Sequence, residues 1–264
     1  HYCGHTEMMP GLCPGCGSKN IGGFGIGTQQ IELAVKKMFP TAKVLRMDAD
    51  TTSKKGSHDR ILSAFANHEA DILVGTQMIV KGHDFPNVTL VAALAADMSL
   101  YAGDYRSSER TFELLMQASG RAGRAEKAGE VVIQTYNPEE YSIQAVAGQD
   151  AEYFYENELA FRRLMKYPPY SQMAAILILS EEENEAKTLS EKLAENIHSV
   201  CGDAVTLIGP SKAGLSRAKD RYRYVLYVKS MDEEAMACVR EIAEEANRRV
   251  VNQKTCSVQY DRDP

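Results

Sequence analysis

No apolar run in this sequence is long enough to span a membrane, because the most apolar stretch, Val88 to Leu100, is interrupted by Asp97. Internal repeats and low-complexity segments are also absent. The hydrophobic fraction of 44% and the charged fraction of 25% are ordinary for globular proteins, which excludes collagen, coiled coil and disorder as descriptions of the whole chain. We therefore expect a soluble, folded protein, and 264 residues are enough for two domains.

The sequence has no large excess of charge of one sign, since its formal net charge is −6. Overall charge therefore gives no indication of nucleic-acid binding, although a local basic patch can still provide it. The chain begins at His1 rather than Met, and no basic and apolar leader precedes the globular pattern. We expect a piece of a longer protein.

The sequence also has no Gly-Lys pair, so the phosphate-binding loop G-x-x-x-x-G-K-[ST] is missing. The acidic stretch Asp232 to Ala235 resembles a magnesium-binding box only superficially. It opens an amphipathic helix, and its acids are better explained as the helix cap and first turn. The groups that would cradle the phosphates of a nucleotide must lie elsewhere.

Short apolar strands alternate with helices from Gly23 to Lys166. The expected strands lie at about 43–47, 71–75, 89–94 and 130–135. The expected helices lie at about 28–39, 58–67, 107–119, 141–147 and 151–165. This alternation predicts an α/β domain with a parallel sheet that helices cover on both faces.

The order of elements changes after Pro168-Pro169, which marks a boundary. The elements expected there are a strand at 173–179, a helix at 183–200, strands at 205–208 and 222–228, a helix at 232–250 and a strand at 257–260. This βαββαβ order is typical of an α+β, ferredoxin-like domain. We therefore divide the chain into residues 1–22, 23–166 and 167–264.

Residues 1–22 contain a cysteine cluster. Cys13-Pro14-Gly15-Cys16-Gly17 has the C-x2-C form of a zinc knuckle, in which glycine lets backbone amides face the thiolates. Two knuckles make a tetrahedral zinc site, and Cys3 resembles half of a second one, so we expect a partial zinc module with Cys3, Cys13 and Cys16 as ligands. Three unrelated thiols are the alternative, and His1 or His5 could act as a fourth ligand. The other cysteines are expected to be reduced and to pack as small hydrophobes: Cys201, Cys238 and Cys256.

The loop at residues 76–85 follows a buried strand and leads into the next one. In open α/β sheets, ligands bind at the carboxyl ends of the strands. Thr76 and Lys81 can donate to phosphate, Gly82 lets a partner approach the backbone, and Asp84 can accept from a sugar hydroxyl. The alternative is that the histidine of this loop and Asp84 only cap it.

The segment Gln117 to Arg124, with the sequence QASGRAGR, lies at the end of an expected helix. Arg121 and Arg124 are three residues apart and share one face. Two guanidinium groups suit a triphosphate, because one of them can neutralise the γ-phosphate in the transition state as an arginine finger. The alternative is a solvated basic helix end that interacts with the helix dipole.

Two further segments are candidates for DNA contact. Arg221 and Arg223 alternate with Tyr222 and Tyr224 in a locally basic stretch, which suits backbone contact combined with base stacking. A half-exposed strand gives the same alternation. The glycine-rich segment before Thr28 opens a helix, so its amides and the Thr28 hydroxyl could hold a DNA phosphate, or they could form a simple capped turn.

These motifs resemble the bacterial primosomal protein N′ family, the PriA replication-restart DNA helicases of superfamily 2. The resemblance extends over the whole chain and is specific in Arg46 to Thr52, Asp71 to Met78, Lys81 to Val91, Glu109 to Phe112, Gln117 to Arg124, Ile133 to Thr135, Tyr167 to Tyr170 and Asp261 to Pro264. It implies a remnant of a binuclear zinc module, a parallel-sheet RecA-like second helicase lobe and a C-terminal α+β domain.

The resemblance also implies roles for single residues. The loop at 76–85 corresponds to helicase motif V, which couples nucleotide state to the DNA backbone. The Gln117 to Arg124 segment corresponds to motif VI, in which Arg124 would be the finger on the γ-phosphate, Arg121 a second phosphate contact and Gln117 a polar positioner. Cys3 and the Cys13/Cys16 pair would belong to different zinc ions. The first helicase lobe and the Walker motifs are absent, so this chain alone should not hydrolyse ATP.

The activity that the resemblance implies is that of an ATP-dependent 3′ to 5′ DNA helicase. It would recognise stalled forks and reload the replicative helicase, with ATP, Mg²⁺ and two Zn²⁺ per full-length chain. The implied partners are forked and single-stranded DNA, single-stranded-DNA-binding protein and other primosome proteins, in the bacterial cytoplasm at the nucleoid and without a membrane. A fork-remodelling duplex translocase and a non-enzymatic zinc and DNA-binding adaptor remain alternatives.

Overall fold

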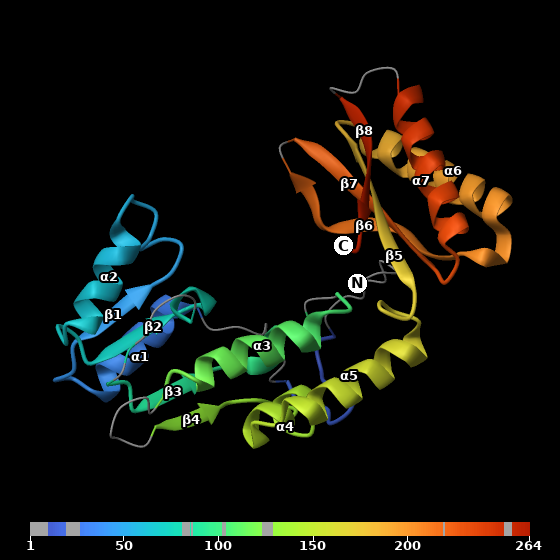
Figure 1. The fold of residues 1–264 in the computed structure, drawn as a ribbon. Helices are drawn as coiled ribbons and strands as arrows, with labels where there is room; N and C mark the ends of the chain where they lie inside the picture. Colours follow the sequence, from blue (N-terminus) through green and yellow to red (C-terminus); the bar gives the residue numbers. More distant parts are fainter. Residues whose placement is uncertain are drawn as a thin grey trace. The chain divides into compact units, whose positions relative to one another are not determined.

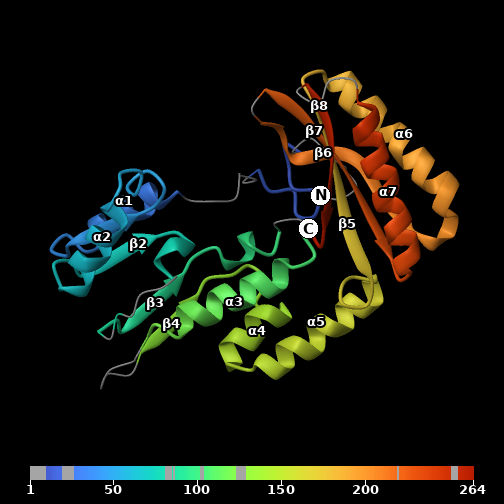
Figure 2. The ribbon, with the colours of Figure 1, turned by 45° about the horizontal axis from the view of Figure 1, so that its top comes forward.

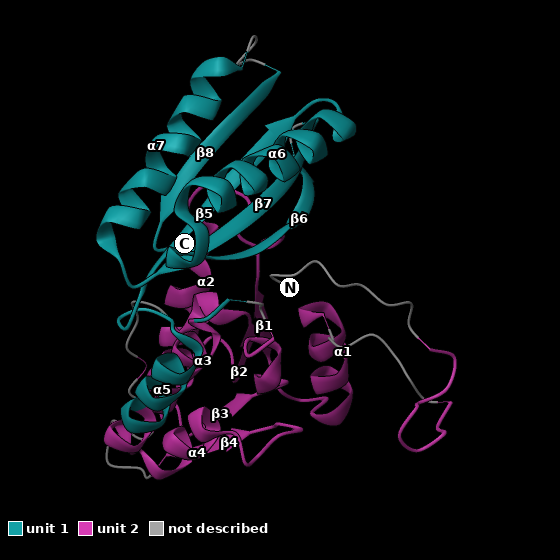
Figure 3. Cartoon of the chain, turned by 90° about the vertical axis from the view of Figure 1, so that its right-hand side faces the viewer, with its two compact units in different colours: residues 1–9, 103–105, 155–264 teal, residues 10–102, 106–154 magenta. Residues whose placement is uncertain are grey.

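The computed structural model of this chain describes residues 10–19, 27–80, 85, 87–101, 104–122, 129–218, 220–250 and 255–264. As far as it is described, the chain forms two compact units, which Figure 3 colours separately. The first unit holds residues 10–102 and 106–154, and the second holds residues 104–105 and 155–264. No helix of the described part has the length and apolar character that a bilayer crossing requires.

The first unit contains two pairs of short parallel strands (Figure 1). β1 (Val44–Met47) pairs with β2 (Ile72–Gly75), and β3 (Leu90–Ala93) pairs with β4 (Glu130–Ile133). The helices of this unit are α1 (Thr28–Met38), α2 (Ser57–Ala66), α3 (Ser107–Ser119) and α4 (Tyr141–Gly148), with 3-10 turns at η1 (Gln77–Ile79) and η2 (Ala96–Met98). Helix α5 (Ala151–Met165) begins in this unit and continues into the second.

The expected single parallel sheet is not what the described residues form. They make two separate two-stranded sheets, so the prediction of one RecA-like sheet covered on both faces is not confirmed. Burial in β3 and β4 alternates between exposed and half-buried residues, and Leu90 and Val132 are 56% and 46% exposed. Short apolar runs locate strands, but they do not determine which strands become neighbours.

Each strand pair of the first unit has its own small core. Met47 of β1 and Leu62 of α2 pack with Phe85, and the Phe85 ring meets Phe65 edge-on at a centroid distance of 5.1 Å. The second core lies around α3, α4 and the start of α5, where the rings of Phe112 and Phe154 are stacked at 4.1 Å. These cores fix the strand ends and the helix α3 that carry the candidate site.

The second unit has the order β5 (Gln172–Ser180), α6 (Glu183–Cys201), η3 (Gly202–Ala204), β6 (Thr206–Ala218), β7 (Arg221–Ser230), α7 (Glu233–Arg249) and β8 (Cys256–Arg262). Its strands form one antiparallel sheet in the order β6-β7-β5-β8. Helices α6 and α7 lie side by side on one face of this sheet (Figures 1 and 2). This is a βαββαβ arrangement.

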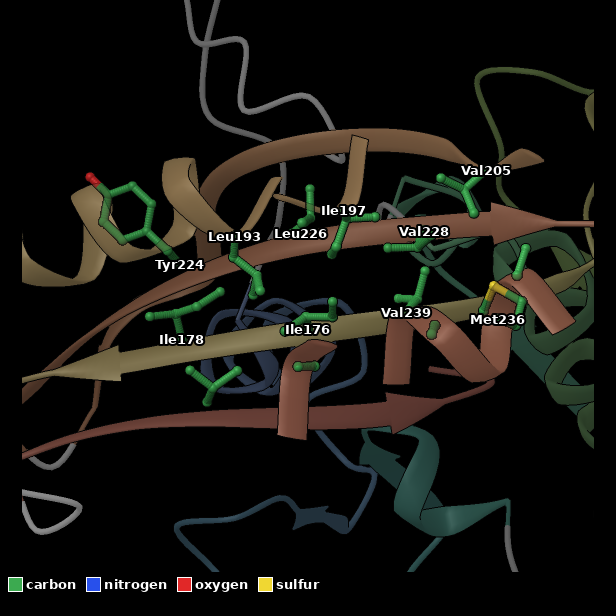
Figure 4. Packing of buried hydrophobic residues seen from close by; sticks show 14 of the residues in the cluster. Ile176, Ile178, Leu193, Ile197, Val205, Tyr224, Leu226, Val228, Met236 and Val239 are labelled. Atoms are coloured by element: carbon green, nitrogen blue, oxygen red, sulfur yellow. The ribbon is translucent and has the colours of Figure 1, made fainter. Parts of the chain in front are cut away.

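The core of the second unit lies between the sheet and its two helices. Ile176 of β5, Leu226 and Val228 of β7, Ile197 of α6 and Val239 of α7 are fully buried and point toward one another (Figure 4). Alternate residues of each strand supply this face, because side chains alternate along a strand. The same alternation turns the residues between them to the opposite face of the sheet.

Candidate nucleotide and DNA interface

Arg121 connects the end of α3 to the residue that follows the turn η1. Its Nη2 donates a hydrogen bond of 2.7 Å to the carbonyl oxygen of Val80, and Val80 is buried just after the turn η1. The backbone N–H of Arg121 donates to Ala118, which continues the last turn of α3. The structure thus brings Arg121 of the one predicted segment and Val80 of the other together.

A second donor of the Arg121 guanidinium, Nε, does not take part in the hydrogen bond to Val80. Its Nε is buried and has no hydrogen-bond partner among the residues that the structure describes. A buried donor without an acceptor is costly, so such a group is a reasonable point of contact for a ligand. Gln117 on α3 and Thr76 before η1 are both exposed.

Gly75 is a further residue of this region that the sequence analysis missed. It ends β2, and a Cβ atom there would lie 2.5 Å from the carbonyl oxygen of Met47 and 2.8 Å from the Ile79 side chain. Only glycine allows β2 to end so close to β1 and the chain to turn directly into Thr76. The signal was present as a glycine at the end of an apolar strand.

Several predicted site residues lie outside the described residues. They are Cys3, Lys81, Gly82, Asp84 and Arg124. Their roles stay predictions.

The Thr28 hydroxyl is already engaged. At the start of α1 it donates a hydrogen bond of 2.5 Å to the carboxylate of Asp48, which is 7% exposed and also accepts from the backbone N–H of Thr51. These bonds, the Thr28 hydroxyl first, hold the pKa of Asp48 below its ordinary value. The hydroxyl proton is therefore not available to a phosphate while this bond stands. The backbone N–H groups of the first turn remain, since the N-cap Gly27 has no capping side chain.

Asp97 joins the ends of β3 and β4. It lies in η2, is 1% exposed, and accepts from the Thr135 hydroxyl at 2.5 Å and from the backbone N–H groups of Tyr136 and Asn137 at 2.9 and 3.2 Å. Burial alone would raise its pKa, but these hydrogen bonds outweigh burial and lower the pKa. Asp97 is therefore a buried, charged acceptor that holds the residues after β4 against the residues after β3.

Arg221 and Arg223 lie on β7 and are half-buried, and the guanidinium of Arg223 donates to the Leu215 carbonyl at 3.4 Å. The interleaved tyrosines were expected to stack on bases, and this is wrong for Tyr224. It is 8% exposed and belongs to the core beneath α6 and α7, against which Tyr222 also packs. Strand alternation turns the tyrosines to the helical face and the arginines to the other face.

The Cys13 to Cys16 turn has the local geometry of a metal knuckle. The backbone N–H of Gly17 donates to the Cys13 carbonyl at 2.8 Å, and Gly17 has a φ of +68°, which favours glycine. Backbone N–H groups of Cys16 and Gly15 donate to the Cys13 sulfur and hold the pKa of its thiol below the ordinary value. Among the described residues there is no group of three or more potential metal ligands. The structure therefore places two of the predicted zinc ligands, the thiols of Cys13 and Cys16.

Comparison with known proteins gives consistent matches along the chain. The Helicase conserved C-terminal domain family matches residues 23–126, and the Primosomal protein N C-terminal domain family matches residues 163–264. The Replication restart protein PriA of Bacillus subtilis is 48% identical over all 264 residues, and that of Synechocystis is 42% identical over 229 residues, or 87% of the chain.

The chain belongs to the PriA family of replication restart proteins. It spans about a third of the length of these relatives, namely 33% of the Bacillus and 28% of the Synechocystis protein. A PriA of Haemophilus influenzae is 36% identical over 86% of the chain. Among solved structures, the designed protein Foldit4 aligns with 36% of the chain at 14% identity and a TM-score of 0.29, which is too slight to bear on the fold.

The predicted site residues that the structure describes can be assigned to the two matched family domains. Arg121, Thr76 and Thr28 fall inside the match to the helicase domain, and Arg221 and Arg223 fall inside the match to the primosomal domain. The sequence analysis did not single out Asp97 or Gly75. Asp97 was visible only as an interruption of an apolar stretch, and a buried acid in such a stretch is the signal that could have found it.

Proposed function

We propose that this chain is part of an ATP-dependent 3′ to 5′ DNA helicase that recognises stalled replication forks and directs primosome assembly for replication restart. The observation that carries the proposal is the hydrogen bond between Arg121 and Val80, because Val80 and Arg121 lie in the two segments that the resemblance assigns to helicase motifs V and VI. Membership of the PriA family supports the same activity. The whole protein, not this chain alone, would perform the reaction.

ATP and Mg²⁺ would be held between this chain and a part of the protein that carries the phosphate-binding loop. Arg124 is the proposed arginine finger, Arg121 a second phosphate contact and Gln117 a polar positioner, and Gly82 and Asp84 are proposed nucleotide contacts. The Nε of Arg121 has no hydrogen-bond partner in the described part of the chain, which supports its role, since a phosphate oxygen would satisfy it. The sequence lacks a Gly-Lys pair, so we expect no hydrolysis by this chain on its own.

Strand motion would follow from closing and opening of the two lobes. When ATP is bound, the arginines would complete the site across the lobe interface. Hydrolysis would remove the contacts between the arginines and the γ-phosphate, so the lobes could open again. The 76–85 loop would transmit this change to DNA, because the hydrogen bond from Arg121 to Val80 ties the backbone of the loop to the end of α3. Thr76 and Lys81 are the proposed DNA contacts there.

DNA would also contact two other places on the chain. At the start of α1, the proposed phosphate contact at Thr28 uses the backbone, because its hydroxyl is bound to Asp48. On β7, Arg221 and Arg223 are proposed contacts for the DNA backbone, on the sheet face opposite α6 and α7. Single-stranded-DNA-binding protein and other primosome proteins are the proposed protein partners, and the bacterial cytoplasm and nucleoid the proposed location.

Zinc is proposed as a structural ion. Cys13 and Cys16, with N–H groups directed at the Cys13 sulfur, fit half of a tetrahedral thiolate site, and Cys3 is proposed as a ligand of a second ion. Bound zinc would fold the segment around residues 1–22. We also propose that residues 23–166 act as the helicase lobe and residues 167–264 as the C-terminal domain.

Strand displacement by the full-length protein tests the proposed activity. A fork with a 3′ single-stranded tail should be unwound only with a hydrolysable nucleotide triphosphate, and a fork with a 5′ tail should not. Loss of unwinding in Arg124→Ala with fork binding retained would agree with the proposal. Fork binding without any ATP-dependent unwinding by the wild-type protein would instead favour an adaptor.

A further inference from the structure

Two cysteines lie together on the helical side of the second unit. Cys201 is the last residue of α6 and Cys238 lies in the first half of α7, and these helices lie side by side over one face of the sheet (Figures 1 and 2). Both are half-buried, neither forms a disulfide, and their thiols are hydrogen-bonded to each other. Cys256 on β8 is 2% exposed and buried in the sheet.

The surroundings make the two thiols unequal. Burial, and after it the hydrogen bond to Cys238, raises the pKa of the Cys201 thiol to about 11, so Cys201 stays protonated at neutral pH. Cys238 lines an open groove between α6 and α7, together with Leu193 and Ile242, and a small solute can reach it from there. The thiolate is the reactive form of cysteine, so a thiol that is held protonated reacts slowly, and Cys238, which the groove exposes, is the one that meets an oxidant first.

We propose that Cys201 and Cys238 form a reversible disulfide when the protein meets hydrogen peroxide. The Cys238 thiolate attacks one peroxide oxygen, the O–O bond breaks, hydroxide leaves and a sulfenic acid forms. The Cys201 sulfur then attacks the sulfenic sulfur, the S–S bond forms and the S–O bond breaks, and the Cys201 proton leaves with that oxygen as water. The hydroxide takes up the proton that Cys238 lost when it ionised, so two thiols lose two electrons and one peroxide is reduced to two waters.

The bond would join the end of α6 to α7. Each helix is otherwise held through its apolar face against the sheet, with Ile197 and Val239 as the nearest fully buried anchors on the two helices. A covalent link at Cys201 and Cys238 would join the two helices outside that core. The inference depends only on the second unit and stands whether or not the proposed helicase activity is correct.

Peptide mapping after oxidation tests the proposal. The chain is treated with hydrogen peroxide, remaining thiols are blocked with iodoacetamide, and the tryptic peptides are analysed by mass spectrometry. We expect a linked pair of peptides that contains Cys201 and Cys238 and disappears on treatment with dithiothreitol. Mapping separates this link from any bond at Cys13 and Cys16.

Three serine variants assign the order of events. Cys201→Ser should accumulate a sulfenic acid on Cys238 that dimedone traps, whereas Cys238→Ser should give at least about tenfold less dimedone adduct on Cys201. Cys256→Ser is the matched control and should keep the link, and circular dichroism checks that each variant is folded. The proposal is overturned if the oxidised wild-type chain lacks the link, if Cys256 replaces either partner, or if Cys201 reacts as fast without Cys238.

Discussion

The guanidinium of Arg121 donates a hydrogen bond to the carbonyl oxygen of Val80, 41 residues earlier in the chain. The contact joins a side chain expected to face a phosphate to the backbone of a loop expected to face DNA. The hydrogen bond therefore couples the position of Arg121 to the backbone of this loop at Val80. The same residue can then take part in both nucleotide contact and loop positioning.

Arg121→Ala should reduce ATP turnover of the full-length protein at saturating ATP. Loss of a donor to the transition state costs about 100-fold in turnover in comparable sites, and the variant also loses the bond to Val80. Arg60→Ala on the exposed side of α2 is the matched control and should retain turnover. Steady-state hydrolysis with saturating forked DNA measures both. Equal turnover of Arg121→Ala and wild type would contradict the role of Arg121.

Asp97→Asn should destabilise the chain at neutral pH. The substitution removes the charge from a buried acceptor of three hydrogen bonds, and one such bond to a charged group contributes about 1.5 to 3 kcal/mol. Because the folded pKa of Asp97 is lowered, its contribution is present above the unfolded pKa of about 3.9 and is lost as pH falls through the folded value.

Urea unfolding at several pH values measures this difference. The free-energy gap between wild type and Asp97→Asn should shrink as the pH is lowered from about 5 toward about 2.5. Asp50→Asn, at an exposed position, is the control and should show little effect at any pH. A gap that stays constant across this range would show that the Asp97 charge does not stabilise the fold.

Arg221→Gln and Arg223→Gln should each lower the salt dependence of fork binding. One lost phosphate contact reduces the slope of log K against log salt by about one unit. Tyr224→Phe should leave fork affinity unchanged, because that ring is buried under the helices. Arg240→Gln, on α7, is the matched control for charge. Fluorescence anisotropy measures all four, and an unaltered slope in both β7 variants would exclude this face as a DNA contact.

Zinc analysis of the chain should give at most one ion per molecule. Cys16→Ser should lower that content, since Cys13 and Cys16 form the one complete knuckle in the sequence. Cys256→Ser, buried in β8, should leave it unchanged. Elemental analysis after gel filtration provides the measurement, and two zinc ions per chain would contradict the assumed ligand pairing.

Local sequence signals predicted most helices and strands to within one or two residues. Helix α3 was expected at 107–119 and lies at Ser107–Ser119, because its apolar period and its flanking residues agree. β6 was expected to end at residue 208 but continues to Ala218. Gly209-Pro210 indicates a stop, yet β6 is an edge strand with bulges, where a proline needs no partner for its missing N–H.

The sequence indicated which segments belong to the candidate site, but it did not indicate which residues of those segments contact one another. The glycine and arginine pattern around Arg121 indicated phosphate chemistry, but the acceptor at Val80 comes from another element and has no signature of its own. The base-stacking role of Tyr224 was wrong because alternation along a strand gives two faces without saying which one the helices cover. Asp48 as partner of Thr28 depends on the same kind of long-range packing.

The central claim is that the PriA-family protein to which this sequence belongs uses Arg124 to complete an ATPase site that DNA activates. Fork-stimulated ATP hydrolysis by the full-length protein, compared with its Arg124→Ala variant, tests it most directly. We expect stimulation in the wild type and a loss of about 2.7 to 4 kcal/mol of transition-state stabilisation in the variant, with fork binding preserved. Unchanged turnover in Arg124→Ala, or no fork-stimulated turnover in the wild type, would contradict the claim.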